Sequence, residues 1–115
     1  MNRWNIPPSL EQEIAERDQS CVYCNAVFSD AGGEVKSRPT WEHIVNDLSI
    51  VTRENIVRCC TSCNCSKGSK TLGVWLTSTY CRSRGICAES VAPIVRLALV
   101  ASNEPFNARR LAAEA

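Results

Sequence analysis

The sequence predicts a small α+β domain in which two short strands and several helices are arranged around a four-cysteine metal site. Three observations support this prediction. The chain has 115 residues, which fits one domain with a thin core. Eight of these residues are cysteines, and four of them form two C-x-x-C pairs, Cys21/Cys24 and Cys60/Cys63. The short apolar segments alternate between helical and strand periodicity. We therefore expect an N-terminal helix, two strands and further helices towards the C-terminus.

The first expected element is an N-terminal helix that ends near residues 18–20. The pair Pro7-Pro8 prevents the preceding residues from being helical. Ser9 is then a candidate N-cap, and Gln12 stands at the position that completes a capping box. Ile14 contributes to one apolar stripe, so this helix is expected to pack on the core and to lead the chain to Cys21.

Two short strands are expected next. Residues 29–39 are polar and contain two adjacent glycines, which is typical of a loop. Trp41–Val45 then forms a short strand rich in β-branched residues, and residues 46–53 connect it to a second strand that begins at Ile56. The second strand leads directly into the cluster of cysteines.

Helices are expected in the last third of the chain. The spacing of apolar residues predicts a helix from Thr71 to about Tyr80, ended by Gly85. A further helix is predicted within 88–101, with Pro93 tolerated in its first turn. The tail after residue 101 is rich in alanine and arginine and is expected to be a loosely attached helix.

The expected location is the cytoplasm. The N-terminus has no apolar segment of signal-peptide length, and no stretch reaches the roughly 18 apolar residues of a membrane span. We therefore expect no membrane association, and thiols that are reduced or bound to metal. A secreted protein with disulfides is the alternative.

The two C-x-x-C pairs predict a structural zinc site. Two residues between thiolates allow both sulfurs to face one ion, and two such pairs complete a closed tetrahedral site. Cys59 and Cys65 make the second pair ambiguous, and we prefer Cys60 with Cys63 because it keeps the two-residue spacing. The cysteines outside the pairs have a simpler interpretation as small apolar residues. They are Cys59, Cys65, Cys81 and Cys87.

The distribution of charge suggests a polyanionic partner. The net charge is +1, but residues 53–84 are basic, with Glu54 as their one acidic residue. Such an excess fits nucleic acid, and an ordinary solvated surface is the alternative. The basic residues of this segment are Arg53, Arg58, Lys67, Lys70, Arg82 and Arg84.

His43 is the one histidine of the chain, and its surroundings form an ordered set of motifs. It lies in the segment Trp41-Glu42-His43-Ile44-Val45, at the end of the first expected strand. Glu54-Asn55-Ile56-Val57 follows, and then Cys60-Thr61-Ser62-Cys63-Asn64-Cys65-Ser66-Lys67-Gly68. In this order and spacing the sequence resembles the HNH endonuclease family, in its zinc-stapled, four-cysteine branch.

The resemblance covers roughly Ser9 to Leu76 and implies a fold and a division of the chain. The family fold is a ββα-metal finger, in which two antiparallel strands are followed by a helix and a metal ion is held between them. We accordingly assign 1–84 to an HNH nuclease domain and 85–115 to a C-terminal helical extension.

The resemblance also implies a role for each motif residue. Glu42 and Asn64 would hold a catalytic divalent ion, and His43 would be the general base. Asn55 would brace the loop that positions the histidine. Lys67, Arg58 and Lys70 are the candidates for DNA binding, and Lys67 has the best positional match.

Hydrolysis of a phosphodiester needs these residue types. An unperturbed imidazole titrates near pH 6.5 and suits a general base in the cell. Carboxylate and amide oxygens suit a hard ion, which would stabilise charge on the phosphate and the leaving oxygen. The family usually has Asp or His where this chain has Glu42, and Asn64 is a common variant at the last position. Both residues favour a weakly held Mg²⁺ or Mn²⁺ over a tightly held transition metal.

The sequence thus predicts a metal-dependent endonuclease that hydrolyses DNA. A non-catalytic zinc finger that binds nucleic acid or protein on the same scaffold is the alternative function. The combination of Glu42, His43 and Asn64 favours the enzyme, because a binding module has no need of all three.

Overall fold

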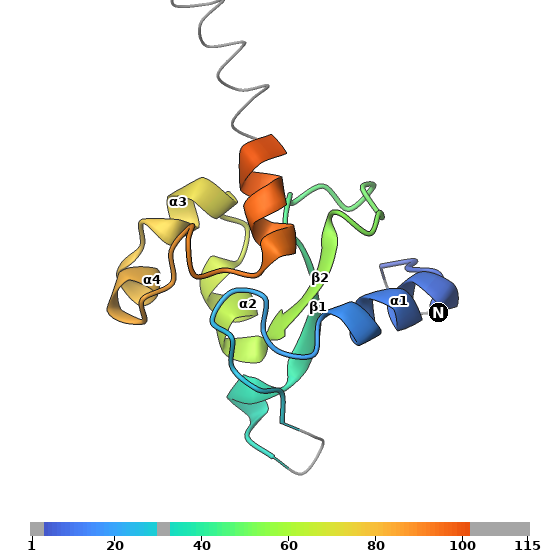
Figure 1. The fold of residues 1–115 in the computed structure, drawn as a ribbon, viewed down its shortest axis with the longest axis horizontal. Coiled ribbons are helices and arrows are strands. Elements are labelled where there is room, and N and C mark those ends of the chain that lie inside the picture. Colours follow the sequence, from blue (N-terminus) through green and yellow to red (C-terminus); the bar gives the residue numbers. More distant parts are fainter. Residues whose placement is uncertain (1–3, 30–32, 102–115) are drawn as a thin grey trace, which may run out of the picture.

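The computed structural model describes residues 4–29 and 33–101 and has a small α+β fold (Figure 1). The coarse prediction is therefore confirmed. The elements in chain order are α1 (Pro8–Arg17), η1 (Val35–Ser37), β1 (Pro39–His43), β2 (Ile56–Cys60), α2 (Thr61–Lys67), α3 (Leu72–Leu76) and α4 (Thr79–Ser83). A further helix occupies residues 93–101, and the tail predicted beyond it lies outside the described residues.

Helix α1 begins at a proline and has no side-chain N-cap. Pro7 is the N-cap and makes no side-chain capping bond, and Pro8 is the first helical residue. Proline suits this position since its missing N–H would be unpaired there in any case. The predicted capping box of Ser9 and Gln12 was therefore wrong. At the other end, Arg17 donates to the Asp18 carboxylate at 2.7 Å and to the Ile56 carbonyl at 2.9 Å, which fixes α1 to β2.

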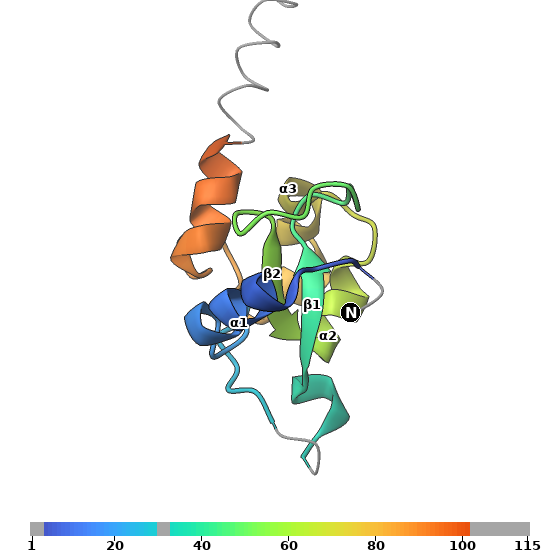
Figure 2. The same cartoon turned by 90° about the vertical axis from the view of Figure 1, so that its right-hand side faces the viewer.

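The sheet consists of two antiparallel strands and continues directly into a helix. The register pairs Pro39 with Cys60 at one end of the ladder and His43 with Ile56 at the other end. Helix α2 starts at the residue after β2, and its N-cap is Cys60, whose sulfur accepts a hydrogen bond from the Cys63 amide. The sheet lies between α1 on one side and α2 on the other (Figure 1 and Figure 2).

Strand alternation distributes the β2 side chains over two apolar clusters. Val57 and Cys59 belong to the larger cluster, which includes Trp75 of α3. Ile56 and Trp41 belong to a smaller cluster with Ile14 of α1. Neighbouring strand residues face opposite sides. The strand therefore presents alternate side chains to α2 and to α1.

The helix predicted from Thr71 to Tyr80 is two short helices. Thr71 caps α3 by accepting from the Val74 amide, and Ser78 caps α4 by accepting from the Cys81 amide. Hydroxyl side chains compete in this way with helical backbone bonds, so the run of Thr and Ser near residue 78 interrupts the helix. Gly85 follows α4 with φ of +68°, a left-handed conformation that suits glycine.

The described part of the predicted extension packs on the core. Ile86, Val91 and Val95 belong to the same buried cluster as Val22. The Ala92 amide also donates to the Val22 carbonyl at 2.8 Å. Residues 85–101 thus cover the segment that carries the first cysteine pair. Within the described ranges, no helix combines the length and the apolarity that crossing a membrane requires.

Candidate functional site

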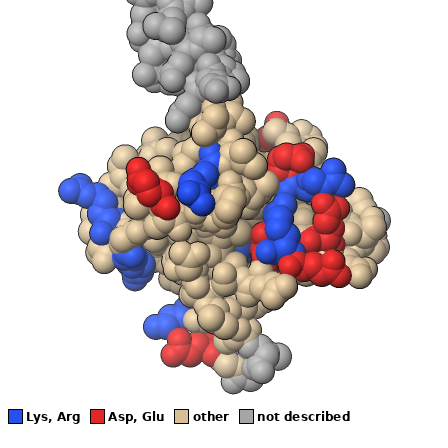
Figure 3. Space-filling view, viewed as in Figure 1, with Lys and Arg blue, Asp and Glu red and all other residues tan. Residues whose placement is uncertain are grey.

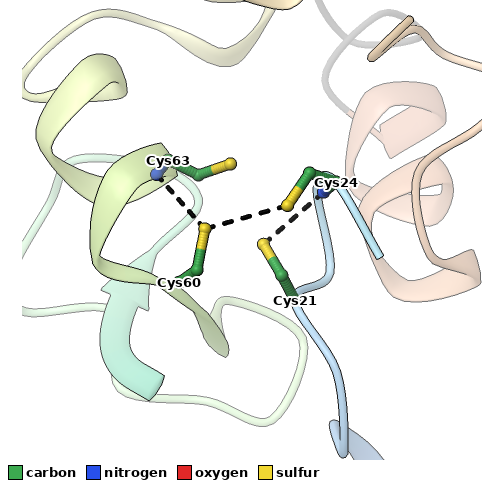
Figure 4. A group of neighbouring side chains, drawn as sticks. All are labelled: Cys21, Cys24, Cys60 and Cys63. Carbon is green, nitrogen blue, oxygen red and sulfur yellow. Dashed lines mark hydrogen bonds between the residues drawn. The ribbon is translucent and has the colours of Figure 1, made fainter. Parts of the chain in front are cut away.

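The four predicted cysteines converge in one cluster. The sulfur atoms of Cys21, Cys24, Cys60 and Cys63 all lie within 4.8 Å of one another. A tetrahedral zinc ion with Zn–S bonds of about 2.3 Å places its sulfurs about 3.8 Å apart. The Cys24 and Cys60 sulfurs are 3.8 Å apart, and all four point towards a common centre (Figure 4). This cluster could therefore hold one metal ion.

Local backbone structure positions both cysteine pairs. The first pair lies in a tight turn, in which the Cys21 amide donates to the Ala26 carbonyl at 2.9 Å and the Asn25 amide donates to the Cys21 carbonyl at 2.9 Å. Asn25 has φ of +66°, which asparagine tolerates better than most residues. The second pair occupies the junction of β2 and α2, where the Cys63 amide in the first turn of the helix faces the Cys60 sulfur.

The sulfur atoms also receive hydrogen bonds, and those at Cys60 favour its thiolate form. The Cys24 amide approaches the Cys21 sulfur at 3.5 Å, and the Cys63 amide approaches the Cys60 sulfur at 3.4 Å. Hydrogen bonds from the Cys21 and Cys63 thiols lower the pKa of Cys60 well below its ordinary value. Metal ions bind the thiolate form, so these contacts suit a metal ligand. The Tyr80 hydroxyl adds a contact of 3.4 Å to the Cys63 sulfur.

The other four cysteines lie outside this cluster. Cys59 and Cys81 are buried, as small apolar residues often are. Cys65 and Cys87 are exposed. The preferred pairing of Cys60 with Cys63 is thus the one that brings four sulfurs together.

A pocket of about 330 Å³ adjoins the edge of β1. It contains three of the predicted catalytic residues, Glu42, His43 and Asn64, in its wall. Thr40, Asn46 and Gly68 also contribute to the lining. The pocket thus brings Glu42 and His43 of β1 together with Asn64 of α2.

His43 presents an unpaired nitrogen. The residue is only 5% exposed, and its Nε2 atom is buried without a hydrogen-bond partner among the described residues. Burial lowers the pKa of His43 below the ordinary imidazole value. The Asp47 carboxylate raises this pKa and the Lys67 ammonium lowers it, and the net shift is downward. The neutral imidazole is therefore favoured, and neutral imidazole can accept a proton.

Asn55 ties together the loop that follows His43. Its Oδ1 accepts from the Val45 amide at 2.8 Å, and its Nδ2 donates to the carbonyls of Val45 at 3.2 Å and Ile50 at 3.0 Å. The Asn55 carbonyl also accepts from the Ile44 amide at 2.9 Å. Asn55 is buried, and its three side-chain bonds and one backbone bond fix the chain on the C-terminal side of His43. Such contacts correspond to the bracing role that the resemblance implies.

Asn64 is held by its amide nitrogen. Nδ2 donates to Thr40 Oγ1 at 2.9 Å and to the Trp41 carbonyl at 3.3 Å. These contacts to β1 orient the side chain from α2, and they use only the donor end of the amide. The oxygen is the end that a hard cation binds.

Glu42 forms a buried ion pair with Lys67. Lys67 is 0% exposed, and its Nζ lies 3.0 Å from Glu42 Oε2. The same oxygen accepts from the Tyr23 hydroxyl at 3.2 Å, and Nζ also donates to the Ile44 carbonyl at 3.1 Å. Burial raises the pKa of Glu42, and the Lys67 ammonium offsets only part of this rise. The carboxylate thus already has one cationic partner.

Replacing Lys67 with methionine should destabilise the protein by about 3–5 kcal/mol, because it leaves the Glu42 carboxylate buried without its counter-ion. Adding Glu42→Gln should recover most of this loss, since the remaining group is then neutral. Urea unfolding of the two single variants and the double variant measures the coupling.

Lys70→Met is the matched control for this experiment. Lys70 is exposed and close in sequence, so its replacement should change the free energy of unfolding by less than about 0.5 kcal/mol. If Lys67→Met were as mild as this control, the ion pair would have no structural role.

The candidates for DNA binding differ in their accessibility. Lys67 is fully buried and its ammonium is occupied, so its prediction as a phosphate contact is corrected to a structural role. The Arg58 guanidinium lies 5.1 Å from the Phe28 ring centroid and 5.7 Å from that of Trp41. Lys70 remains exposed beside the pocket residue Asn46, whose side chain donates to the Lys70 carbonyl at 3.0 Å.

The basic excess of the second half is partly neutralised in three dimensions. Arg53 pairs with Glu13 of α1 at 2.6 Å, and Lys67 pairs with Glu42 at 3.0 Å. On the face drawn in Figure 3, basic and acidic side chains lie next to one another over α1, so that this face has no continuous basic surface. On this face, charge therefore does not identify a nucleic-acid interface.

Two residues near the site were missed from the sequence. Thr40 could have been found, because strand alternation places it on the same face as Glu42. Tyr23 could not, since its contact with Glu42 depends on how the turn of the first cysteine pair folds back on the sheet.

No protein-family model matches the chain, and no match was found among the curated proteins or the solved structures.

Proposed function

We propose that this protein is a metal-dependent endonuclease that hydrolyses DNA phosphodiester bonds on a zinc-stapled ββα-metal finger of the HNH type. The strand–strand–helix unit β1, β2 and α2 would be the finger. Cys21, Cys24, Cys60 and Cys63 would bind a structural zinc ion at one end of it, in a closed site with no open position for a water.

The observation that supports the proposal is the buried Nε2 atom of His43. A buried polar atom without a partner is costly, and a catalytic role is one of the reasons for which such an atom is kept. This atom belongs to an imidazole whose pKa is lowered, in a pocket that Glu42 and Asn64 also line. We assign His43 the role of general base that takes a proton from the attacking water.

Glu42 and Asn64 would hold a divalent ion at the same pocket. Asn64 offers an amide oxygen, and its contacts to Thr40 and Trp41 keep the side chain directed from α2 to β1. Glu42 offers a carboxylate that is shared with Lys67, which favours a weakly held ion. Mg²⁺ or Mn²⁺, when bound, supplies positive charge for the phosphate and the leaving oxygen.

The Glu42–Lys67 pair also favours a second candidate function, a non-catalytic zinc finger that binds nucleic acid or protein. An ion pair of 3.0 Å already neutralises the carboxylate without a metal ion. In that case the pocket would bind a ligand without hydrolysing it.

A plasmid-nicking assay separates the two candidates. We expect purified protein, dialysed free of Mg²⁺ without a chelator, to leave supercoiled DNA intact and to convert it to the open-circular form when Mg²⁺ or Mn²⁺ is added. Dialysis retains the tightly bound structural zinc, so that the fold is the same in both reactions. An absence of cleavage with either ion would leave only the binding module.

A further inference from the structure

The pocket beside His43 has an apolar wall that phosphodiester hydrolysis alone does not need. Trp4, Trp41 and Leu48 line it together with the polar residues of the candidate site. Leu48 is 60% exposed although it is a large apolar residue. Phosphate, water and a hydrated cation gain nothing from such a wall, because all three need polar partners.

The aromatic part of this wall lies directly against the proposed base. The ring centroids of Trp4 and His43 are 5.4 Å apart, and the two rings meet edge to face. Trp75 belongs to the core and is 0% exposed. Trp41 is only half-buried and lines the pocket, so these two tryptophans have different surroundings.

The volume of the pocket corresponds to a small organic group. At about 330 Å³ it lies at the lower end of the range of roughly 300–1,000 Å³ that is usual for ligand sites. A general base reaches its substrate directly or through one water, so the reacting phosphate must lie at this pocket. The sugar and base of the same nucleotide are then the groups nearest to the apolar wall.

We propose that the pocket binds one unstacked nucleotide, with its base against Trp4 and Leu48 and its phosphate towards His43. This inference rests on the proposed nuclease function and specifies its substrate class. In a regular duplex the base is held in the stack and cannot enter a pocket. The preferred substrate is therefore single-stranded DNA or an unpaired nucleotide within a duplex.

Binding of a short oligonucleotide tests the inference independently of cleavage. A fluorescein-labelled single-stranded hexanucleotide is titrated with protein in the absence of added divalent ion, and anisotropy gives the Kd. Trp4→Ala should weaken binding about 5- to 150-fold, which corresponds to the roughly 1–3 kcal/mol of one base–aromatic stack. The same variant should bind a hexanucleotide of abasic sites as the unaltered protein does.

Two further variants control for folding. Leu48→Ala removes an exposed part of the wall, so it should weaken binding without lowering the Tm. Leu97→Ala is the matched control, because Leu97 is 64% exposed on the helix at 93–101 and does not line the pocket. Equal affinity of the unaltered protein for normal and abasic hexanucleotides would overturn the inference.

Cleavage rates then distinguish the two sources of an unpaired nucleotide. A single strand, a fully paired duplex and the same duplex with one mismatch are compared in Mg²⁺. We expect the paired duplex to be cleaved at least tenfold more slowly than the single strand, and a fast mismatched duplex would indicate a flipped nucleotide. Equal rates on all three substrates would refute the nucleotide subsite but leave the nuclease function intact. A loss of cleavage on every substrate would count against the nuclease function alone. The binding titration would then still decide whether the subsite exists.

Discussion

Replacing Cys21 with serine should unfold the protein at 25 °C. Structural zinc sites of zinc-finger peptides contribute apparent binding free energies of about 10–16 kcal/mol. Single domains are stable by only about 5–15 kcal/mol, so the loss of one thiolate ligand can remove the whole margin. The effect should be large here because the four sulfurs join the turn at 21–24 to the junction of β2 and α2. Far-ultraviolet circular dichroism and zinc analysis of the purified variant measure the result.

Cys65→Ser is the control for the cysteine experiment. Cys65 is exposed, lies on the same helix as Cys63 and does not belong to the sulfur cluster. Its replacement should leave one zinc per chain and the Tm within a few degrees of the original value. A Cys21→Ser protein with the same zinc content and Tm as this control would refute the metal site.

Replacing His43 with alanine should reduce Mg²⁺-dependent DNA nicking by about 10²- to 10⁴-fold, the usual contribution of a general base. The unpaired Nε2 atom has no structural bond to lose among the described residues, and so the variant should keep its zinc and its cooperative unfolding. Initial rates of conversion from supercoiled to open-circular plasmid measure the loss.

Val45→Ala is a control close to the histidine. The Val45 side chain is 46% exposed, and the bonds between this residue and Asn55 use only the Val45 backbone, which alanine retains. This variant should cut DNA at the original rate. If His43→Ala and Val45→Ala nicked plasmid equally fast, His43 would not be the base.

The strands could be predicted from the sequence, but their ends could not. Strand β1 runs from Pro39 to His43, whereas β-branched composition predicted residues 41–45. Proline is tolerated as the first residue of a strand in a two-stranded sheet, because its missing N–H can face away from the ladder. The strand ends at His43 because the backbone N–H and carbonyl of Val45 form hydrogen bonds with the Asn55 side chain and not with a strand. Such a tertiary contact has no local signal.

The residues around the candidate site were predictable to different degrees. The four-sulfur cluster followed from spacing, since two C-x-x-C pairs restrict the possible geometry. The burial of Lys67 did not follow, because a lysine near a helix end is usually exposed. Its position depends on which face of α2 packs against β1, and that is decided by the whole core.

The position of the four sulfurs has a consequence for the order in which the protein folds. Cys24 and Cys60 are 36 positions apart, and a bound ion would close the intervening chain into a loop. By analogy with a covalent cross-link, a closure of this length reduces the entropy of the unfolded chain by an equivalent of about 4 kcal/mol. Both Glu42 and His43 lie inside that loop, while the ion itself would sit at the opposite end of the strand ladder from His43. Nascent chains that encounter zinc early would thus search far fewer conformations before the two strands pair.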